Sequence, residues 1–145
     1  MTGLEIQRLL LDILPCWNYQ IVKPFKQKLD KNISFEMYCL IKIIQQNGEA
    51  LSLSRLSCLT RIPKQQITKL SDRLVKQEMV KRIYDPSDRR IIKLCLTDKG
   101  TDFLDSHLND SKYFVSLLEP LTEQEYDSFR QSLELLSEVF TKLYY

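Results

Sequence analysis

Residues 61–93 of this 145-residue chain are RIPKQQITKLSDRLVKQEMVKRIYDPSDRRIIK. The segment carries ten lysines and arginines against four acidic residues, whereas residues 97–145 carry four basic and ten acidic residues. The formal net charge of +2 for the whole chain hides this division. A cationic block inside an otherwise neutral or acidic protein is the electrostatic footprint of a nucleic-acid contact surface. Double-stranded DNA is therefore the first partner to consider.

The first half of this block predicts a helix over residues 63–77. Pro63 suits the first helical position, where its missing N–H costs nothing. The apolar residues recur at spacings of three and four and mark the buried face: Ile67, Leu70 and Leu74. A tight turn at residues 60–62 separates this helix from a short one over residues 55–59, which Ser52 or Ser54 caps. Two helices joined by a tight turn indicate a helix-turn-helix.

The second half of the block predicts a β-hairpin. Residues 80–84 and 91–96 are rich in apolar and β-branched side chains, and they flank the polar segment DPSDRR. Asp85 followed by Pro86 suits the first two positions of a type I turn. A hairpin directly after a helix-turn-helix indicates a wing.

Helices are also predicted on the N-terminal side of the block. Apolar residues at helical spacing predict a helix over residues 4–21, which Pro15 and Pro24 should kink, start or break. Ser34 can cap a second helix, which ends near the terminator pair Asn47-Gly48. A short strand over residues 50–53 then leads into the block.

Two helices are predicted on the C-terminal side. Thr97 caps one that runs from Asp98 towards Leu118, and Thr122 with Glu125 forms a capping box for the last. One side of that last helix is apolar: Tyr126, Phe129, Leu133, Leu136, Phe140 and Leu143. The expected order is helix, helix, short strand, helix, helix, hairpin, helix, helix, which is a mainly α (α+β) winged helix-turn-helix. Its outer helices keep surplus apolar surface that a second copy of the chain would bury.

Bulk composition excludes several other classes of protein. The chain is 43% hydrophobic and long enough for one domain, residues 1–145. It has no apolar run of 18 residues and no secretory signal pattern, so we expect a cytoplasmic protein without membrane association. The four cysteines lack metal-ligand spacing and His107 is the single histidine, which predicts reduced thiols and no metal. No arrangement of residues suits catalysis or cofactor binding, so an enzyme is not expected.

Residues 56–100, LSCLTRIPKQQITKLSDRLVKQEMVKRIYDPSDRRIIKLCLTDKG, resemble the core of a MarR-type transcriptional regulator. The most specific pieces are ITKLSDRLVKQ, DPSDRR and LTDKG. The resemblance covers nearly the whole chain, and implies a DNA-binding core at about residues 34–100 and dimerisation helices at about 4–30 and 98–145. It implies a homodimer on a pseudo-palindromic DNA site, which we expect to be a repressor released by a signal. Arg61 and Glu78 stand where the family often has glycine, so either the turn geometry differs or modest strain is carried.

The resemblance makes the helix over residues 63–77 the recognition helix, whose N-terminal half would reach base edges in the major groove. The residues expected there are Lys64, Gln65, Gln66, Thr68 and Lys69. Glutamine suits adenine, the threonine methyl suits thymine and lysine suits guanine. Better placed for phosphates are Arg61, Arg73, Lys76 and Arg89. Any single one of these is equally well explained as a solvated surface side chain, so the prediction depends on the cluster.

In related proteins an Asp-x-Arg pattern at the wing tip places an arginine in the minor groove. The pattern here is Asp88-Arg89-Arg90. We expect Arg90 to enter the groove and Asp88 to brace it, because arginine suits the narrow, negative minor groove of A·T-rich DNA. The simpler alternative is a surface ion pair that only stabilises the hairpin.

Sensing is less determined by the sequence. The family commonly has a ligand pocket between its dimerisation helices and its winged domain, and an aromatic or lipophilic effector could bind there against Trp17, Ile21, Phe25, Phe35 and Tyr38. An aromatic stripe at helical spacing is also what a plain core produces. A redox switch at Cys16 is a second alternative, although no basic residue is closer in sequence than Arg8 or Lys23.

A protein-interaction module without a DNA role is the remaining alternative. Such a module would present apolar residues on the outer face of the helix over residues 63–77. That face is polar and basic here, which favours DNA.

Overall fold

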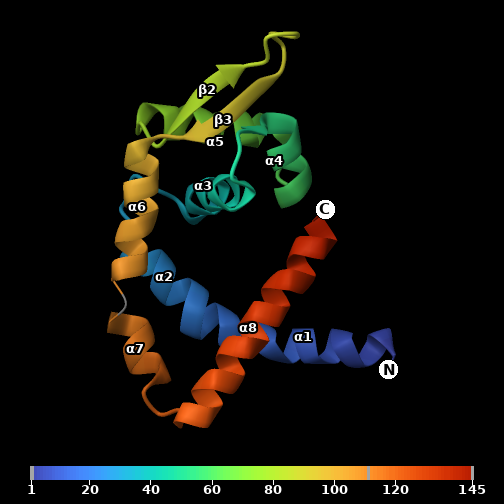
Figure 1. Ribbon diagram of the computed structural model, residues 1–145, viewed down its shortest axis with the longest axis vertical. Coiled ribbons are helices and arrows are strands. Elements are labelled where there is room, and N and C mark those ends of the chain that lie inside the picture. The colour runs from blue at the N-terminus through green and yellow to red at the C-terminus, as the bar shows by residue number, and fades with distance from the viewer. Residues whose placement is uncertain (1, 111, 145) are drawn as a thin grey trace.

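The structure is a computed structural model that describes residues 2–110 and 112–144. Its elements are, in chain order, α1 (Gly3–Trp17), η1 (Asn18–Val22), α2 (Lys23–Lys28), α3 (Phe35–Asn47), β1 (Leu51–Ser52), α4 (Leu53–Thr60), α5 (Lys64–Lys76), β2 (Val80–Tyr84), β3 (Ile92–Leu96), α6 (Asp98–Asn109), α7 (Lys112–Leu118) and α8 (Glu123–Tyr144). Figure 1 shows a head, made of α3, α4, α5 and the sheet, above a frame made of α1, η1, α2, α7 and α8. Helix α6 leads from the head down to the frame. The mainly helical winged helix-turn-helix predicted from the sequence is confirmed.

The hydrophobic core belongs to the head. Among the described residues, the buried apolar side chains all fall between Ile33 and Leu104. Ile67 and Leu74 are fully buried and Leu70 is nearly so, which confirms the predicted inner face of α5. Burying a side chain of this size contributes about 1.5–3 kcal/mol relative to leaving it exposed. The core therefore fixes which face of α5 remains on the surface.

Hydroxyl side chains begin the helices where the sequence predicts them. The side-chain oxygens of Ser34, Ser52 and Thr97 each accept a hydrogen bond from the backbone N–H three residues on. Thr122 and Glu125 form the reciprocal capping box, with N–H to side-chain oxygen distances of 2.8 and 3.2 Å. Each such cap contributes about 1 kcal/mol.

The short sheet has the order β1-β3-β2, with both pairs antiparallel. Val80 pairs with Leu96 and Tyr84 with Ile92, so β2 and β3 form the predicted hairpin. The tip of the hairpin is organised around Asp85. Its carboxylate accepts hydrogen bonds from the N–H groups of Ser87 and Asp88, and the N–H of Ile91 bonds the Asp88 carbonyl at 3.0 Å. The short polar side chain of Asp85 substitutes for a backbone acceptor, as aspartate often does in turns.

Two non-glycine residues have left-handed backbone conformations. Arg61 ends α4 with φ 57° and Glu78 follows α5 with φ 60°. These are the two positions where glycine is expected from the resemblance, so the chain keeps the geometry and carries the strain. A left-handed residue with a side chain costs roughly 1 kcal/mol relative to glycine.

We expect Glu78→Gly to raise the free energy of unfolding by about 0.5–1 kcal/mol, because glycine adopts this backbone at no steric cost. Urea unfolding at fixed protein concentration measures the change. The matched control is Gln77→Gly, one residue earlier, where φ is −79° and glycine should destabilise. A Glu78→Gly protein less stable than the unaltered chain would contradict this account.

The two prolines were predicted to kink, start or break the N-terminal helical segment; neither breaks it, and one of them starts a helix. Pro15 lies inside α1 and Pro24 lies at the start of α2, and the turn between them is π-helical. Proline at position 24 has no N–H for the Gln20 carbonyl and crowds it. The wider π turn accommodates this, and the Tyr113 hydroxyl of α7 donates to the Gln20 oxygen at 2.7 Å. The segment is therefore helical from residue 3 to residue 28.

The single helix predicted from Asp98 towards Leu118 is wrong. Helix α6 ends at Asn109, and α7 begins at Lys112. Asp110 has a non-helical backbone, with φ −84° and ψ 73°. Asparagine and aspartate compete for backbone hydrogen bonds and favour helix ends, so two of them in succession interrupt the helix despite the apolar residues on either side.

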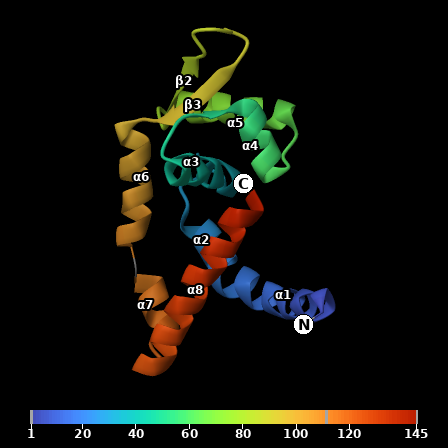
Figure 2. The same ribbon diagram turned by 45° about the vertical axis from the view of Figure 1, so that its right-hand side comes forward.

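The frame has no core of its own in this single chain. None of the described residues of α1, α2, α7 and α8 is buried. Large apolar side chains stay exposed on α1, for example Leu9 at 57% and Ile13 at 54%. Figures 1 and 2 both show α1 extending away from the rest of the molecule, and α8 rising to end beside α4. There the Arg55 guanidinium donates to the Tyr144 carbonyl at 3.1 Å.

No helix in the described part of the chain combines the length and the apolar composition required to cross a membrane.

Candidate nucleic-acid interface and ligand pocket

The outer face of α5 is polar and fully accessible. All five residues predicted to contact bases are exposed: Lys64, Gln65, Gln66, Thr68 and Lys69. The Thr68 hydroxyl donates to the Lys64 carbonyl at 3.0 Å, which leaves the methyl group and the acceptor capacity of the oxygen for contacts. The four residues predicted to contact phosphates are also exposed: Arg61, Arg73, Lys76 and Arg89. The structure thus presents a cationic and amide-rich surface next to the wing.

A charged contact connects this helix to the base of the wing. The Arg82 guanidinium of β2 pairs with the Asp72 carboxylate of α5. The pair neutralises an acidic group on the helix that carries the cationic face. The pair also links the wing to α5 through side chains, in addition to the backbone connection between them. The sequence pattern did not predict this contact.

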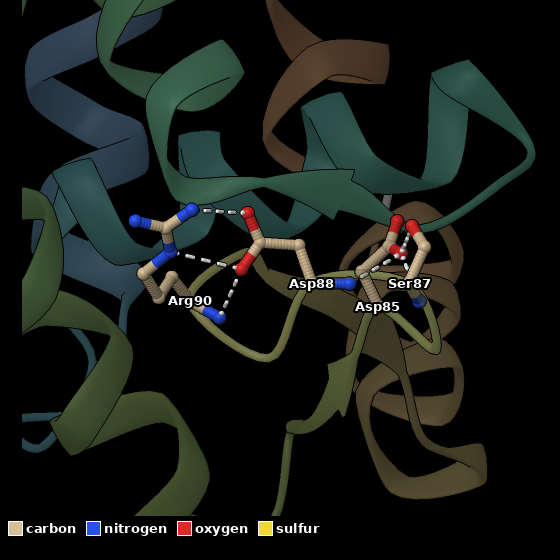
Figure 3. A network of polar contacts seen from close by, with 4 residues as sticks. All are labelled: Asp85, Ser87, Asp88 and Arg90. Carbon is tan, nitrogen blue, oxygen red and sulfur yellow. Dashed lines mark hydrogen bonds and ion pairs between the residues drawn. The ribbon is translucent and has the colours of Figure 1, made fainter.

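At the wing tip, Asp88 holds Arg90. The guanidinium donates through Nε and Nη2 to the two carboxylate oxygens, each at 3.1 Å, and the Arg90 N–H donates to the same carboxylate at 3.0 Å (Figure 3). The arginine side chain is nevertheless 91% exposed. Both ends of the residue are thus fixed while the side chain remains open to solvent, which is the bracing geometry predicted for Asp-x-Arg.

The same hydrogen bonds lower the pKa of Asp88 below its ordinary value, chiefly through the Arg90 side chain. The pKa of Asp85 is lowered as well, mainly by the Ser87 hydroxyl. A carboxylate whose pKa is lower in the folded protein than in the unfolded chain stabilises the fold fully above its unfolded-state pKa. This stabilisation is lost as the pH falls through its folded-state pKa. Both groups are therefore ionised throughout the neutral range, and the tip stays braced there.

A pocket of 430 Å³ lies where the head meets the frame. All five residues predicted to form a ligand pocket line it: Trp17, Ile21, Phe25, Phe35 and Tyr38. Phe25 is central, with its ring centroid 4.6 Å from Tyr38 and 5.6 Å from His107. The structure therefore brings residues from α1, η1, α2 and α3 together around one space.

Several lining residues were missed by the sequence reasoning: Val22, Cys39, His107, Leu108, Asp110 and Phe114. The sequence singled out His107 only as the single histidine; its ring lies 4.7 Å from that of Phe103, and the residue lines this pocket. These residues come from η1, α3, and the α6 and α7 region. The approach of α6 and α7 to α2 depends on tertiary packing, for which the sequence pattern has no signal.

Two polar groups of the pocket wall, the Tyr38 hydroxyl and the Cys39 thiol, are held neutral. Burial raises the pKa of Tyr38, and the pKa of Cys39 is raised by burial and then by the Glu36 carboxylate, against a smaller opposing effect of Lys26. Their O–H and S–H groups therefore act as uncharged hydrogen-bonding groups at neutral pH. The described residues include no cluster of three metal-ligating side chains.

Cys16 is exposed on α1 and is not a pocket residue. Redox-sensing cysteines usually lie beside cations that favour the thiolate. Lys23 instead has its ammonium over the Tyr19 ring, 5.6 Å from the centroid. We expect hydrogen peroxide to leave DNA affinity unchanged, as measured by fluorescence anisotropy. A loss of affinity that Cys16→Ser abolishes would establish the redox alternative.

Comparison with known proteins finds similarity to the MarR family and a shared fold. Residues 36–92, which span α3 to the wing, match the model of the MarR family. An uncharacterized HTH-type transcriptional regulator of Bacillus subtilis, YpoP, is 29% identical to it over 86% of this chain and 83% of its own. The transcriptional repressor MprA of Escherichia coli is 34% identical over 45% of this chain and 37% of its own.

Solved structures of MarR-type regulators share the fold. RV1404 from Mycobacterium tuberculosis superposes with a TM-score of 0.77 at 18% identity, over 96% of this chain and 95% of its own. A mutant MarR from Escherichia coli, complexed with operator DNA, superposes with a TM-score of 0.60 at 19% identity, over 91% and 93%. YpoP and MprA are named as a transcriptional regulator and a transcriptional repressor, not as enzymes.

Proposed function

We propose that this chain is a MarR-type homodimeric repressor that binds a pseudo-palindromic operator and is released by a small aromatic or lipophilic molecule. The observation that supports DNA binding most strongly is the wing tip, where Asp88 holds an exposed Arg90 outward beside the cationic face of α5. A bidentate carboxylate brace on an exposed arginine lowers the conformational entropy lost when that arginine enters a groove. Such a regulator acts where the chromosome is, so we propose a cytoplasmic location.

In this proposal the residues have separate tasks. Lys64, Gln65, Gln66, Thr68 and Lys69 face base edges in the major groove, and Arg90 with its brace Asp88 serves the minor groove. The cations for backbone phosphates are Arg61, Arg73, Lys76 and Arg89. Phosphate contacts supply most of the affinity and position the protein, while base contacts supply the specificity.

The exposed apolar faces of the frame support dimerisation. Apolar residues on α1 and α8 are 36–74% exposed in the single chain. Apolar faces of this extent on two long helices are typical of an interface between subunits. We propose that residues 4–30 and 98–145 form it, and that residues 34–100 are the DNA-binding core of one domain, residues 1–145. Sedimentation should give a mass of two chains, and a strict monomer would contradict the proposal.

The effector site proposed is the 430 Å³ pocket between head and frame. Its aromatic walls and the neutral side chains of Tyr38 and Cys39 suit an uncharged or weakly polar aromatic molecule. The pocket spans elements of both parts, so a ligand that fits only one arrangement of head and frame would shift the separation of the two recognition helices. Trp17 lines the pocket, which provides a fluorescence signal for screening such molecules.

The polar outer face of α5 argues against a protein-interaction module, which would present apolar residues there. Selection of bound sequences from a random duplex pool tests the proposal. We expect enriched sites with two inverted half-sites about one helical turn apart. A pool that shows no enrichment would overturn sequence-specific binding.

A further inference from the structure

Gln66 differs from the other predicted base-contacting residues because a second element holds its side chain. Its Nε2 donates to the Oε2 of Glu36, on α3, at 3.1 Å. Thirty residues separate the two, so the contact is tertiary rather than a consequence of helix geometry. Both side chains are exposed, so the contact lies on the surface that carries the outer face of α5.

Glu36 is attached to a firmly fixed part of the head. It lies in the first turn of α3, which Ser34 caps. The next residue, Met37, is fully buried in the core. The preceding Phe35 lines the pocket, and the Lys26 ammonium lies 4.9 Å from the centroid of its ring. A carboxylate on such a turn can fix the orientation of a partner, because its own backbone has little freedom to move.

The hydrogen bond selects one orientation of the Gln66 amide. An amide presents two N–H donors on one side and an oxygen acceptor on the other, and a free one can turn over and exchange them. Glu36 accepts from one N–H and so keeps the nitrogen on its own side. The second N–H and Oε1 remain available. Those are the two groups a glutamine uses to bind N7 and N6 of adenine.

We propose that Glu36 is a positioning residue that sets the base preference of Gln66. This inference rests on the proposed function, namely that α5 reads DNA in the major groove. Glu36 also places a negative charge near the phosphates of bound DNA. Its removal should therefore weaken discrimination between bases at one position without lowering the affinity for duplexes in general.

The experiment measures binding of the full-length protein to the selected duplex and to duplexes with single base-pair changes. The proteins compared are the unaltered chain, Glu36→Ala, Glu36→Gln, Gln66→Ala and the double variant Glu36→Ala with Gln66→Ala. Gln66→Ala identifies the base pair that Gln66 reads. We expect Glu36→Ala to lower discrimination at that base pair alone by about three- to tenfold, the cost of immobilising one free side chain.

Two variants separate positioning from charge and from stability. Glu36→Gln loses the charge but keeps an oxygen acceptor, so it should retain the discrimination. Asp102→Ala removes an exposed acidic side chain of α6 and should change nothing at that base pair. In the Gln66→Ala background, Glu36→Ala should have no further effect on discrimination. Urea unfolding of Glu36→Ala should match that of the unaltered chain.

The inference is overturned if Glu36→Ala leaves the preference unchanged, or lowers it equally when Gln66 is absent, or if Gln66→Ala itself changes no preference. In each of these cases the unaltered protein still binds its duplex with specificity, so the proposed function stands. Failure of the unaltered protein to bind any duplex would overturn both.

Discussion

Arg90→Glu should weaken binding to the selected operator by about tenfold or more, which corresponds to about 1–3 kcal/mol. The substitution removes a cation that we place in the minor groove and puts a carboxylate beside Asp88. Two carboxylates cannot form the bidentate pair that now orients the residue, so both the contact and its brace are lost. Because each protomer contributes one wing, a dimer loses the contact twice. Fluorescence anisotropy with a labelled operator measures the effect.

Lys31→Glu provides the matched control, since it makes the same charge change on an exposed residue between α2 and α3, outside the segments proposed for DNA binding and for dimerisation. It should alter affinity far less. Equal losses in the two variants would mean that net charge, not the wing, governs binding. Unchanged affinity in Arg90→Glu would leave the Asp88 pair as a hairpin-stabilising ion pair and nothing more.

Gly100→Ala should lower the free energy of unfolding by about 3 kcal/mol, at the upper end of the range for overpacked sites. A Cβ at this position would lie 2.2 Å from the Met79 carbonyl oxygen. That oxygen cannot move freely, because it accepts a hydrogen bond from the Thr97 N–H at 3.2 Å. The close approach holds the start of α6 against the start of β2. Urea unfolding followed by circular dichroism measures the change.

Whether Gly100→Ala raises or lowers the free energy of unfolding is decisive, because helix propensity alone predicts that it rises. Alanine is about 1 kcal/mol better than glycine inside a helix. Thr101→Ala, at the exposed neighbouring position, tests propensity without the clash and should be close to neutral. A Gly100→Ala protein as stable as the unaltered chain would show that the head can shift to accept the methyl group.

Local sequence rules predicted the features that depend on neighbouring residues. The caps at Ser34, Thr97 and Thr122, the left-handed end at Gly48 and the buried face of α5 each follow from a few adjacent positions. These rules work because a helix end or an amphipathic face is determined within one or two turns.

The same rules were insufficient where the conformation of one segment depends on its contacts with another segment. Pro15 and Pro24 predicted a kink, a start or a break. Pro24 starts α2, and the outcome depends on the π turn and on the Tyr113 hydroxyl. The break at Asp110 was overlooked because the apolar pattern continues into α7. Contacts such as Asp72 with Arg82, and Glu36 with Gln66, join residues of separate elements and leave no periodic signal.

The wing and the pocket differ in how completely the sequence predicted them. The wing pair is local, two residues apart, so the Asp-x-Arg pattern was sufficient to predict its geometry. The pocket was predicted only in part, on the side contributed by α1, η1, α2 and α3. Its other wall, with His107 and Phe114, depends on where α6 and α7 pack.

The salt dependence of duplex binding tests the central claim most directly. A dimer that contributes Arg61, Arg73, Lys76 and Arg89 from each chain would neutralise about eight phosphates. Raising salt from about 50 to 200 mM should then lower affinity about a thousandfold or more, because condensed counterions are released on binding. Absence of binding to duplex DNA at the lower salt, or an affinity that does not change with salt, would contradict a cationic DNA-binding surface on this protein.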